Sequence, residues 1–301
     1  MKKLQSFNFY KHFSSGSSSD KKNDVSSETI RETTFQFDLF QKNLPQQKRK
    51  INRVFLEWFI GFAEGDGSII VSQLKSGQVR LFFTLVQKEV EVLEKIRSTL
   101  GFGKVQKHGT CFRYSVTDAE GIDRLIHLFN GNLVLNKFRK RFHSWLHARN
   151  EIRSSAEPII EKEHLPDIKF LSSGWLSGFT DAEGCFNLQK TKNPNGSFYA
   201  SCRFVLVQKD EHEVLKKINK AIGHGYLCYY EDNSVTRYFL IKSEGLDLLL
   251  DYFKKFPLRT NKNISKVRLE KMLNYKKTRK EVPWEGKVLK RVLKLLKKKK
   301  S

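Results

Sequence analysis

Cysteines are few in this sequence, and long apolar runs are absent. The 301 residues include four cysteines, Cys111, Cys185, Cys202 and Cys228, with no Cys-x-x-Cys pair. This spacing supports neither a disulfide framework nor a zinc site, so a reducing compartment is the default expectation. The richest apolar runs are short and interrupted by charges, whereas a membrane span needs roughly 18 consecutive apolar residues. We therefore expect a soluble protein with no membrane partner.

Acidic residues are also scarce. The chain has 32 aspartates and glutamates against 56 lysines and arginines, which leaves a formal net charge of +24. This excess indicates a polyanionic partner, either nucleic acid or an anionic membrane surface. Hydrophobic residues still make up 39% of the chain and include 24 phenylalanines, so a sizeable core can form. The length suits two modest domains or one fused duplicate.

The chain contains an internal repeat. FIGFAEGDG at 59–67 corresponds to LSGFTDAEG at 176–184, and LVQK occurs both at 85–88 and at 206–209. The matches continue in the same order with GFGKV and GHGYL, EGID and EGLD, and LVLNK and LRTNK. Collinear matches at a slowly drifting offset are typical of a duplicated domain with small loop insertions. The sequence therefore predicts two repeats, at 51–149 and 168–280.

Three segments lie outside the predicted repeats. Residues 1–50 are rich in serine and lysine without apolar periodicity, which predicts disorder. This segment is either an organellar transit peptide or a plain extension. Residues 150–167, with two prolines and several charges, are the predicted linker. The basic tail, 281–301, is expected to contact phosphates.

Each repeat has the pattern of an α+β unit. A helix ends at the acidic motif, and two alternating strands follow, at about 68–75 and 79–87 in the first repeat. An amphipathic helix at 90–100, a Gly-x-Gly turn, a second hairpin and closing helices complete the unit. The predicted order is αββαββα, present twice.

The segments FIGFAEGDGSI and LSGFTDAEGCF resemble the LAGLIDADG motif of homing endonucleases. The resemblance continues through LVQK, Gly-x-Gly and Asn-Lys in both halves, and it covers about 230 of the 301 residues. It implies the monomeric, two-motif type, with two pseudo-symmetric repeats and motif helices packed at their interface. It also implies two curved antiparallel sheets that form a saddle on double-stranded DNA.

The motif spacing has a direct physical meaning. Gly61 and Gly65 lie four residues apart on one helix face, as do Gly178 and Ala182, so two such helices can pack with their backbones close together. Because the helices end at Asp66 and Glu183, two carboxylates then meet beside the pseudo-twofold axis. Paired carboxylates repel unless a cation lies between them, and oxygen ligands favour a hard ion such as Mg²⁺.

The resemblance supplies further site residues. It implies that the backbone carbonyls of Gly65 and Ala182 help to ligate metal, and that Ca²⁺ supports binding without cleavage. The polar groups expected beside the metal-binding acids are Gln87, Gln208, Lys137 and Lys262. The other acids of the motifs, Glu64 and Asp181, are expected to be structural.

The resemblance also predicts which side chains contact DNA, since alternate residues of each sheet would face the bases in the major groove. In the first repeat these are Ser68, Ile70, Ser72, Gln78, Arg80, Phe82, Thr84, Lys104, Gln106, His108 and Arg113. In the second repeat they are Cys185, Asn187, Gln189, Thr191, Tyr199, Ser201, Arg203, Tyr226, Tyr230 and Arg237. Because the two sets differ, the preferred target is a long asymmetric sequence.

The sequence thus favours a site-specific, intron-encoded endonuclease that makes a metal-dependent double-strand break. A maturase that binds group I intron RNA is the alternative, since a basic surface suits either polyanion. A DNA-binding protein of the same fold without catalytic activity is a third hypothesis. The richness in Lys, Asn, Phe and Ile indicates an AT-rich organellar genome, with a mitochondrion favoured over a chloroplast.

Overall fold

The computed structural model describes residues 35–46, 48–153, 156–162, 166–192 and 198–278, together with 290, 292 and 294. All of them belong to one compact unit, Thr33–Ser301. Within these residues, no helix has the length and apolar character needed to cross a membrane. Residues 1–34, for which disorder is predicted, lie outside the described residues, and so does most of the basic tail.

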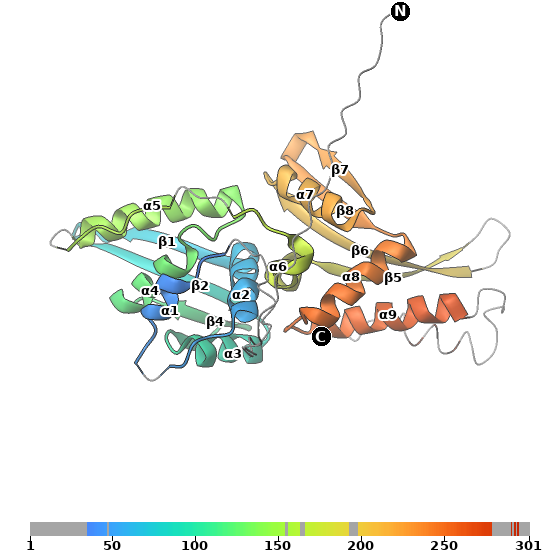
Figure 1. Ribbon diagram of the computed structural model, residues 1–301, viewed down its shortest axis with the longest axis horizontal. Helices are drawn as coiled ribbons and strands as arrows, with labels where there is room; N and C mark the ends of the chain where they lie inside the picture. Colours follow the sequence, from blue (N-terminus) through green and yellow to red (C-terminus); the bar gives the residue numbers. More distant parts are fainter. Residues whose placement is uncertain are drawn as a thin grey trace, which may run out of the picture. The chain divides into compact units, whose positions relative to one another are not determined.

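The first repeat has one four-stranded antiparallel sheet with helices packed around it (Figure 1). Its elements are α2 (Arg53–Asp66), β1 (Gly67–Gln73), β2 (Val79–Gln87), α3 (Val90–Leu100), β3 (Lys104–His108), β4 (Cys111–Val116), α4 (Ala119–Phe129) and α5 (Asn136–Ile152). The strand order is β1-β2-β4-β3. The two helices that close the repeat, α4 and α5, match the closing helices predicted from the sequence.

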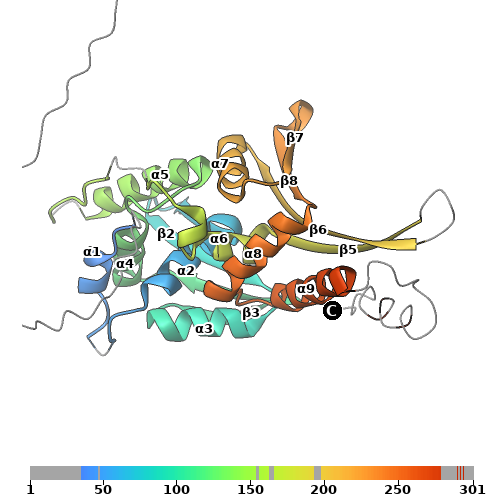
Figure 2. The same cartoon turned by 45° about the vertical axis from the view of Figure 1, so that its right-hand side comes forward.

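The second repeat follows the same plan. Its elements are α6 (Trp175–Glu183), β5 (Cys185–Lys192), β6 (Phe198–Lys209), α7 (His212–Ile222), β7 (Tyr226–Tyr230), β8 (Val235–Leu240), α8 (Ser243–Lys255) and α9 (Lys262–Thr278). The strand order β5-β6-β8-β7 repeats that of the first sheet. Helix α9 runs beside β5 and β6 (Figure 2). The predicted α+β fold with two pseudo-symmetric repeats is confirmed.

The register of the first sheet separates a core face from an open face. Ile70 lies opposite Phe82 in the β1–β2 pair, and directly opposite residues project from the same face. The neighbouring positions Ile69, Leu81 and Phe83 are buried in the core. The alternation predicted from the sequence therefore has the correct phase, because a shift of one residue would have exchanged the two faces.

The repeats meet at α2 and α6, which lie side by side (Figure 1). A β-carbon at Gly61 would overlap the carbonyl oxygen of Trp175 and lie 2.8 Å from the backbone nitrogen of Phe179. A β-carbon at Gly178 would overlap the carbonyl oxygen of Trp58. Only glycine lets the two backbones approach this closely, as the motif spacing predicts.

Residues 35–46 correct the expectation of disorder through residue 50. This segment includes a short helix, α1 (Asp38–Lys42), and Phe35, Phe37 and Phe40 are 3%, 4% and 0% exposed. The backbone of Gln36 exchanges hydrogen bonds with the Asn132 side chain. Three buried phenylalanines outweigh the ordering entropy of a short segment, which the average composition of residues 1–50 conceals.

The region predicted as a linker is partly fastened to the first repeat. Helix α5 extends to Ile152 and so includes the first three residues of the predicted linker. The Asn150 side chain forms two hydrogen bonds with the backbone of Ile159, of 2.9 and 3.0 Å. The Asn130 side chain donates a hydrogen bond to the carbonyl oxygen of Ile160 and accepts one from the backbone nitrogen of Lys162. The described part of this connection therefore follows a defined path along α5.

Candidate active site

The ends of the two motif helices bring Asp66 and Glu183 into one neighbourhood. Asp66 is the last residue of α2 and Glu183 the last of α6, and each is followed by a glycine at which the chain turns into a strand. A β-carbon at Gly65 would overlap the Ala182 methyl group and lie 3.2 Å from Cγ of Glu183. Close helix packing thus fixes where the two carboxylates stand.

Asp66 sits in a half-buried, polar setting. Its Oδ2 accepts a 2.6 Å hydrogen bond from Nε2 of Gln87, at the end of β2. Burial raises the pKa of Asp66, whereas the Gln87 hydrogen bond and the charge of Lys262 lower it. The charge of Glu183 raises the same pKa further, which is the repulsion expected between neighbouring carboxylates.

One lysine at the start of each last helix points towards the predicted site. Lys137, in the first turn of α5, donates a 2.5 Å hydrogen bond to Oε1 of Gln208 in the second repeat. Lys262, the first residue of α9, donates to the carbonyl oxygen of Ala182 at 2.5 Å. Burial lowers the pKa of Lys262, and the charges of Asp66, Asp181 and Glu183 raise it.

The predicted site residues therefore divide into two groups. Asp66, Gln87 and Lys262 are linked by one hydrogen bond and by charge, and Lys137 is bonded to Gln208. Glu183 interacts electrostatically with Asp66 and Lys262, and its side chain forms no hydrogen bond with other described residues. The two halves are thus related in plan but differ in their contacts.

The donor set fits a hard divalent cation. The described residues contain no group of three or more His, Cys, Asp or Glu side chains able to hold a metal. An ion here would instead use the two carboxylates, backbone carbonyls and non-protein oxygens, an arrangement that suits Mg²⁺, which retains several waters. The Lys262 ammonium lies beside the Ala182 carbonyl, and the negative charges of Asp66 and Glu183 favour its charged form, although burial outweighs them and lowers its pKa.

The second acid of each motif joins the repeats crosswise. Oε2 of Glu64 accepts a 2.6 Å hydrogen bond from Nε1 of Trp175, and Oδ2 of Asp181 accepts one of 2.8 Å from Nε1 of Trp58. Glu64 also accepts the backbone N–H groups of Val134 and Leu135. Burial raises the pKa of Glu64 to about 8, although these hydrogen bonds oppose the rise. Such contacts give both acids a structural task.

The residues predicted to face DNA lie on one side of each sheet. In the first sheet, Thr84 is opposite both Ser68 and Ser115, and Gln106 is opposite Arg113. In the second, Asn187 is opposite Arg203. Gln78 immediately precedes β2, whereas Thr191 and Tyr199 form a backbone pair near the outer ends of β5 and β6. The side chains of Thr191 and Tyr199 fall outside the described part of the structure.

Several groups on these faces already interact. Arg113 is 2.6 Å from the His108 ring, Arg203 donates to Gln189, and the guanidinium of Arg237 lies 5.0 Å from the centre of the Tyr230 ring. The sequence reasoning missed further residues on the same faces, although counting by two would have found them. These are Val86, Cys111, Ser115, Val205, Val207, Cys228, Val235 and Phe239.

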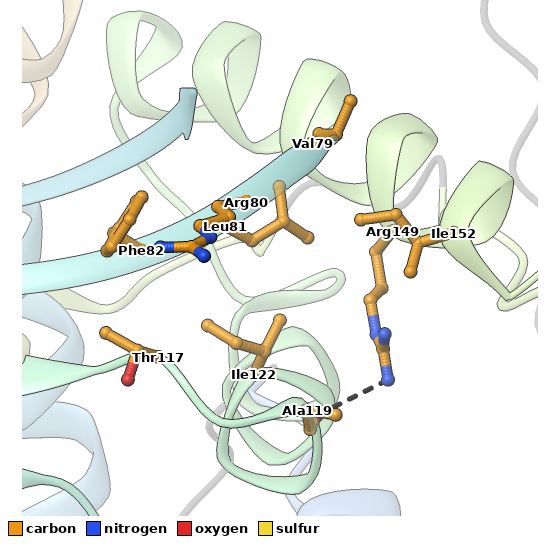
Figure 3. A pocket seen from close by; sticks show the side chains of 9 residues that line it. All are labelled: Val79, Arg80, Leu81, Phe82, Thr117, Ala119, Ile122, Arg149 and Ile152. Carbon is orange, nitrogen blue, oxygen red and sulfur yellow. Dashed lines mark hydrogen bonds between the residues drawn. The ribbon is translucent and has the colours of Figure 1, made fainter. Parts of the chain in front are cut away.

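A hollow of about 410 Å³ lies elsewhere, beside the outer end of β2 (Figure 3). It is lined by Val79, Arg80, Leu81, Phe82, Thr117, Ala119, Ile122, Arg149 and Ile152. Arg149 is held by two hydrogen bonds to Asp123, of 2.8 and 2.9 Å, and by one of 3.5 Å to the Ala119 carbonyl. The lining has no carboxylate and no candidate metal ligand, so the chemistry is expected at the motif helices.

The fold and the paired helix ends define a duplicated α+β protein whose halves meet at an acidic centre. The family model described as LAGLIDADG endonuclease matches residues 59–148 and 176–273. The chain therefore belongs to the LAGLIDADG endonuclease family.

The relatives include a probable intron-encoded endonuclease 4 of Neurospora crassa, 34% identical over 219 residues. The alignment covers 70% of this chain and 38% of the relative. A probable intron-encoded endonuclease of Schizosaccharomyces pombe, Cox1-I1b, is 37% identical over 95 residues, which is 31% of this chain and 25% of that protein. The chain thus spans well under half the length of these two relatives.

Solved structures show the same fold. The LAGLIDADG meganuclease I-AabMI, bound to uncleaved DNA, has a TM-score of 0.68 at 23% identity. I-SmaMI, bound to an uncleaved DNA target in the presence of calcium ions, has a TM-score of 0.64 at 16% identity. Each match covers 80% of this chain and 97% of the other.

Proposed function

We propose that this chain is a site-specific homing endonuclease that uses Mg²⁺ to cut both strands of a long asymmetric DNA target. The observation that carries the proposal is the pair of acids at the ends of the closely packed motif helices, Asp66 and Glu183. Membership of the endonuclease family and the DNA-bound relatives of the same fold support it.

The expected roles of the residues follow from their positions. Asp66 and Glu183, with the carbonyls of Gly65 and Ala182, would hold the metal. When bound, Mg²⁺ lowers the pKa of water and offsets the charge that develops on phosphate oxygens. Gln87 would orient the Asp66 carboxylate through their 2.6 Å hydrogen bond. Lys262, already beside the acids, would balance negative charge at the scissile phosphate.

The open faces of the two sheets would read the DNA sequence. Arginine, glutamine and asparagine side chains suit guanine and adenine edges in the major groove, which is wide enough to admit a β-ribbon. The net charge of +24 would add sequence-independent affinity for phosphates, strongest at low salt. One chain with two unlike repeats would bind as a monomer.

The intron origin and the mitochondrial location belong to the same proposal. Both relatives described above are named as intron-encoded, and one name refers to a cox1 intron. These names favour the endonuclease over the group I intron maturase. The direct comparison is filter binding of structured intron RNA beside duplex DNA. Tight retention of RNA without any DNA cleavage would favour the maturase.

The test is cleavage of a library of randomised duplex targets with Mg²⁺ or with Ca²⁺, followed by sequencing of the cut ends. We expect discrete breaks at one long asymmetric site with Mg²⁺, and binding without breaks with Ca²⁺. Asp66→Asn and Glu183→Gln should each lower the cleavage rate by more than the roughly 100-fold that loss of an outer-shell partner costs. Their affinity for DNA should change little.

A matched control is Asp251→Asn, which alters an exposed acid of α8 that pairs with Lys254. This variant should cut as fast as the wild type. Full cutting by both Asp66→Asn and Glu183→Gln would refute the assignment of the metal-binding acids.

A further inference from the structure

Two glutamates outside the motifs occupy equivalent positions in the two repeats. Glu89 is the N-cap residue of α3 and Glu211 that of α7. Glu89 follows Gln87 by two residues, and Glu211 follows Gln208 by three. Glu211 is only 2% exposed, and its Oε2 has no hydrogen-bond partner among the described residues. A carboxylate this buried needs a compensating partner, and its other oxygen has one.

Each glutamate holds the start of the closing helix in the opposite repeat. Oε1 of Glu211 accepts a 2.7 Å hydrogen bond from the backbone nitrogen of Lys137, in the first turn of α5. Oε2 of Glu89 accepts one of 2.8 Å from the backbone nitrogen of Asn261, which immediately precedes Lys262 and α9. The two contacts follow the pseudo-symmetry with one difference. Glu211 binds the backbone nitrogen of the lysine itself, whereas Glu89 binds that of the residue before the lysine.

At α5 the contact with Glu211 makes up for a missing local cap. The first N–H groups of a helix have no partner within it, and Leu135, at the N-cap of α5, has no side-chain acceptor. A carboxylate there both accepts these hydrogen bonds and offsets the positive end of the helix dipole. The second repeat supplies this cap to the first.

The same contacts close a ring around one lysine. The backbone of Lys137 is bound by Glu211, and its Nζ donates to Gln208, three residues earlier in the chain than Glu211. Two residues of the second repeat therefore hold Lys137, Glu211 at its backbone nitrogen and Gln208 at its ammonium group. A shift of the α5 start would move the ammonium relative to Gln208.

We propose that Glu211 and Glu89 are positioning residues, each aligning the active-site lysine of the opposite repeat and so governing cleavage of one DNA strand. The inference rests on the proposed endonuclease function. Because Glu211 acts on Lys137 and Glu89 on the start of α9, loss of either cap disturbs one lysine and leaves the other in place. The two strands should then be cut at unequal rates.

The experiment is single-turnover cleavage of the target duplex with a different fluorophore on each strand. Glu211→Ala should slow one strand by about tenfold, comparable to the loss of one hydrogen bond to a charged group, and the other strand by less than about twofold. Glu89→Ala should slow the opposite strand. Glu211→Gln, which keeps an oxygen acceptor, should restore most of the lost rate.

Glu213→Ala and Glu91→Ala are the matched controls, because these exposed residues lie two positions further along the same helices. Both should cut the two strands like the wild type. Glu89 is half-exposed, so its alanine variant tests the inference even if the buried Glu211 site tolerates alanine poorly.

The outcomes separate this inference from the proposed function. A wild type that leaves both strands intact overturns the endonuclease assignment itself. A wild type that cuts both strands, with alanine variants that slow them equally or not at all, overturns the positioning role alone. Slowing of the same strand by Glu89→Ala and Glu211→Ala also overturns it.

Discussion

The contact between Gly65 and Ala182 can be tested by moving one methyl group across the helix interface. A β-carbon at Gly65 would overlap the β-carbon of Ala182, the residue at the equivalent position of α6. Gly65→Ala alone therefore places two methyl groups in the space of one. Gly65→Ala combined with Ala182→Gly returns the number of methyl groups to one.

The single variant should lose stability, whereas the double variant should recover most of that loss. Overpacking in a closely packed interface costs typically about 1–3 kcal/mol of unfolding free energy. Alanine is favoured over glycine inside a helix by about 1 kcal/mol, which partly offsets the cost at residue 65. In the double variant this helix term cancels between the two positions. We therefore expect its stability to lie near the wild type, with a favourable coupling of about 1–3 kcal/mol.

The assay is a double-mutant cycle measured by urea unfolding of the four proteins. Gly178→Ala provides the contrast, because a β-carbon there would overlap the backbone oxygen of Trp58, and no side-chain truncation can relieve that clash. If the effects of Gly65→Ala and Ala182→Gly simply add, the helix contact does not control stability as described. Cleavage rates should follow the same order, since this contact sets the spacing of Asp66 and Glu183.

Two further predictions concern stability. Because burial raises the pKa of Glu64 from 4.5 to about 8, the folded protein holds this proton more tightly than the unfolded chain. The stability that this raised pKa contributes is fully present below pH 4.5 and is lost as the pH rises through about 8. Glu64→Gln should flatten the pH dependence of urea unfolding, and an unchanged slope would contradict the assignment. Deleting residues 1–34 should leave the Tm unchanged, whereas deleting 1–42 removes three buried phenylalanines and should cost more than about 3 kcal/mol; equal Tm values would contradict this.

The sequence predicted the repeated part of the fold well because its signals are local. Alternation by two residues placed Ile70 and Phe82 on one face, and the motif glycines predicted the backbone contact at α2 and α6. The pairing of Lys137 with Gln208 is a different matter. A recurring lysine identifies a polar group near the site, but only the packing of the repeats determines which glutamine it meets.

Two kinds of feature escaped the sequence reasoning. The order of residues 35–46 depends on three phenylalanines that bury against the first repeat, and composition averaged over fifty residues hides them. The caps formed by Glu89 and Glu211 join residues that lie far apart in the chain. A glutamate at a helix start carries no local signal of its partner, because only the packing of the two repeats brings it to the other helix.

The crosswise bonds between Trp58 and Asp181 and between Trp175 and Glu64 have a consequence for the ancestry and the engineering of such chains. Each half carries one indole donor and one carboxylate acceptor, the self-complementary arrangement of a twofold dimer. Two copies of one half could in principle satisfy each other's buried acids. The present chain, however, pairs a longer glutamate on one side with a shorter aspartate on the other. This difference of one methylene makes the two junctions unequal, so exchange of a half between related proteins must keep each tryptophan with an acid of the matching length.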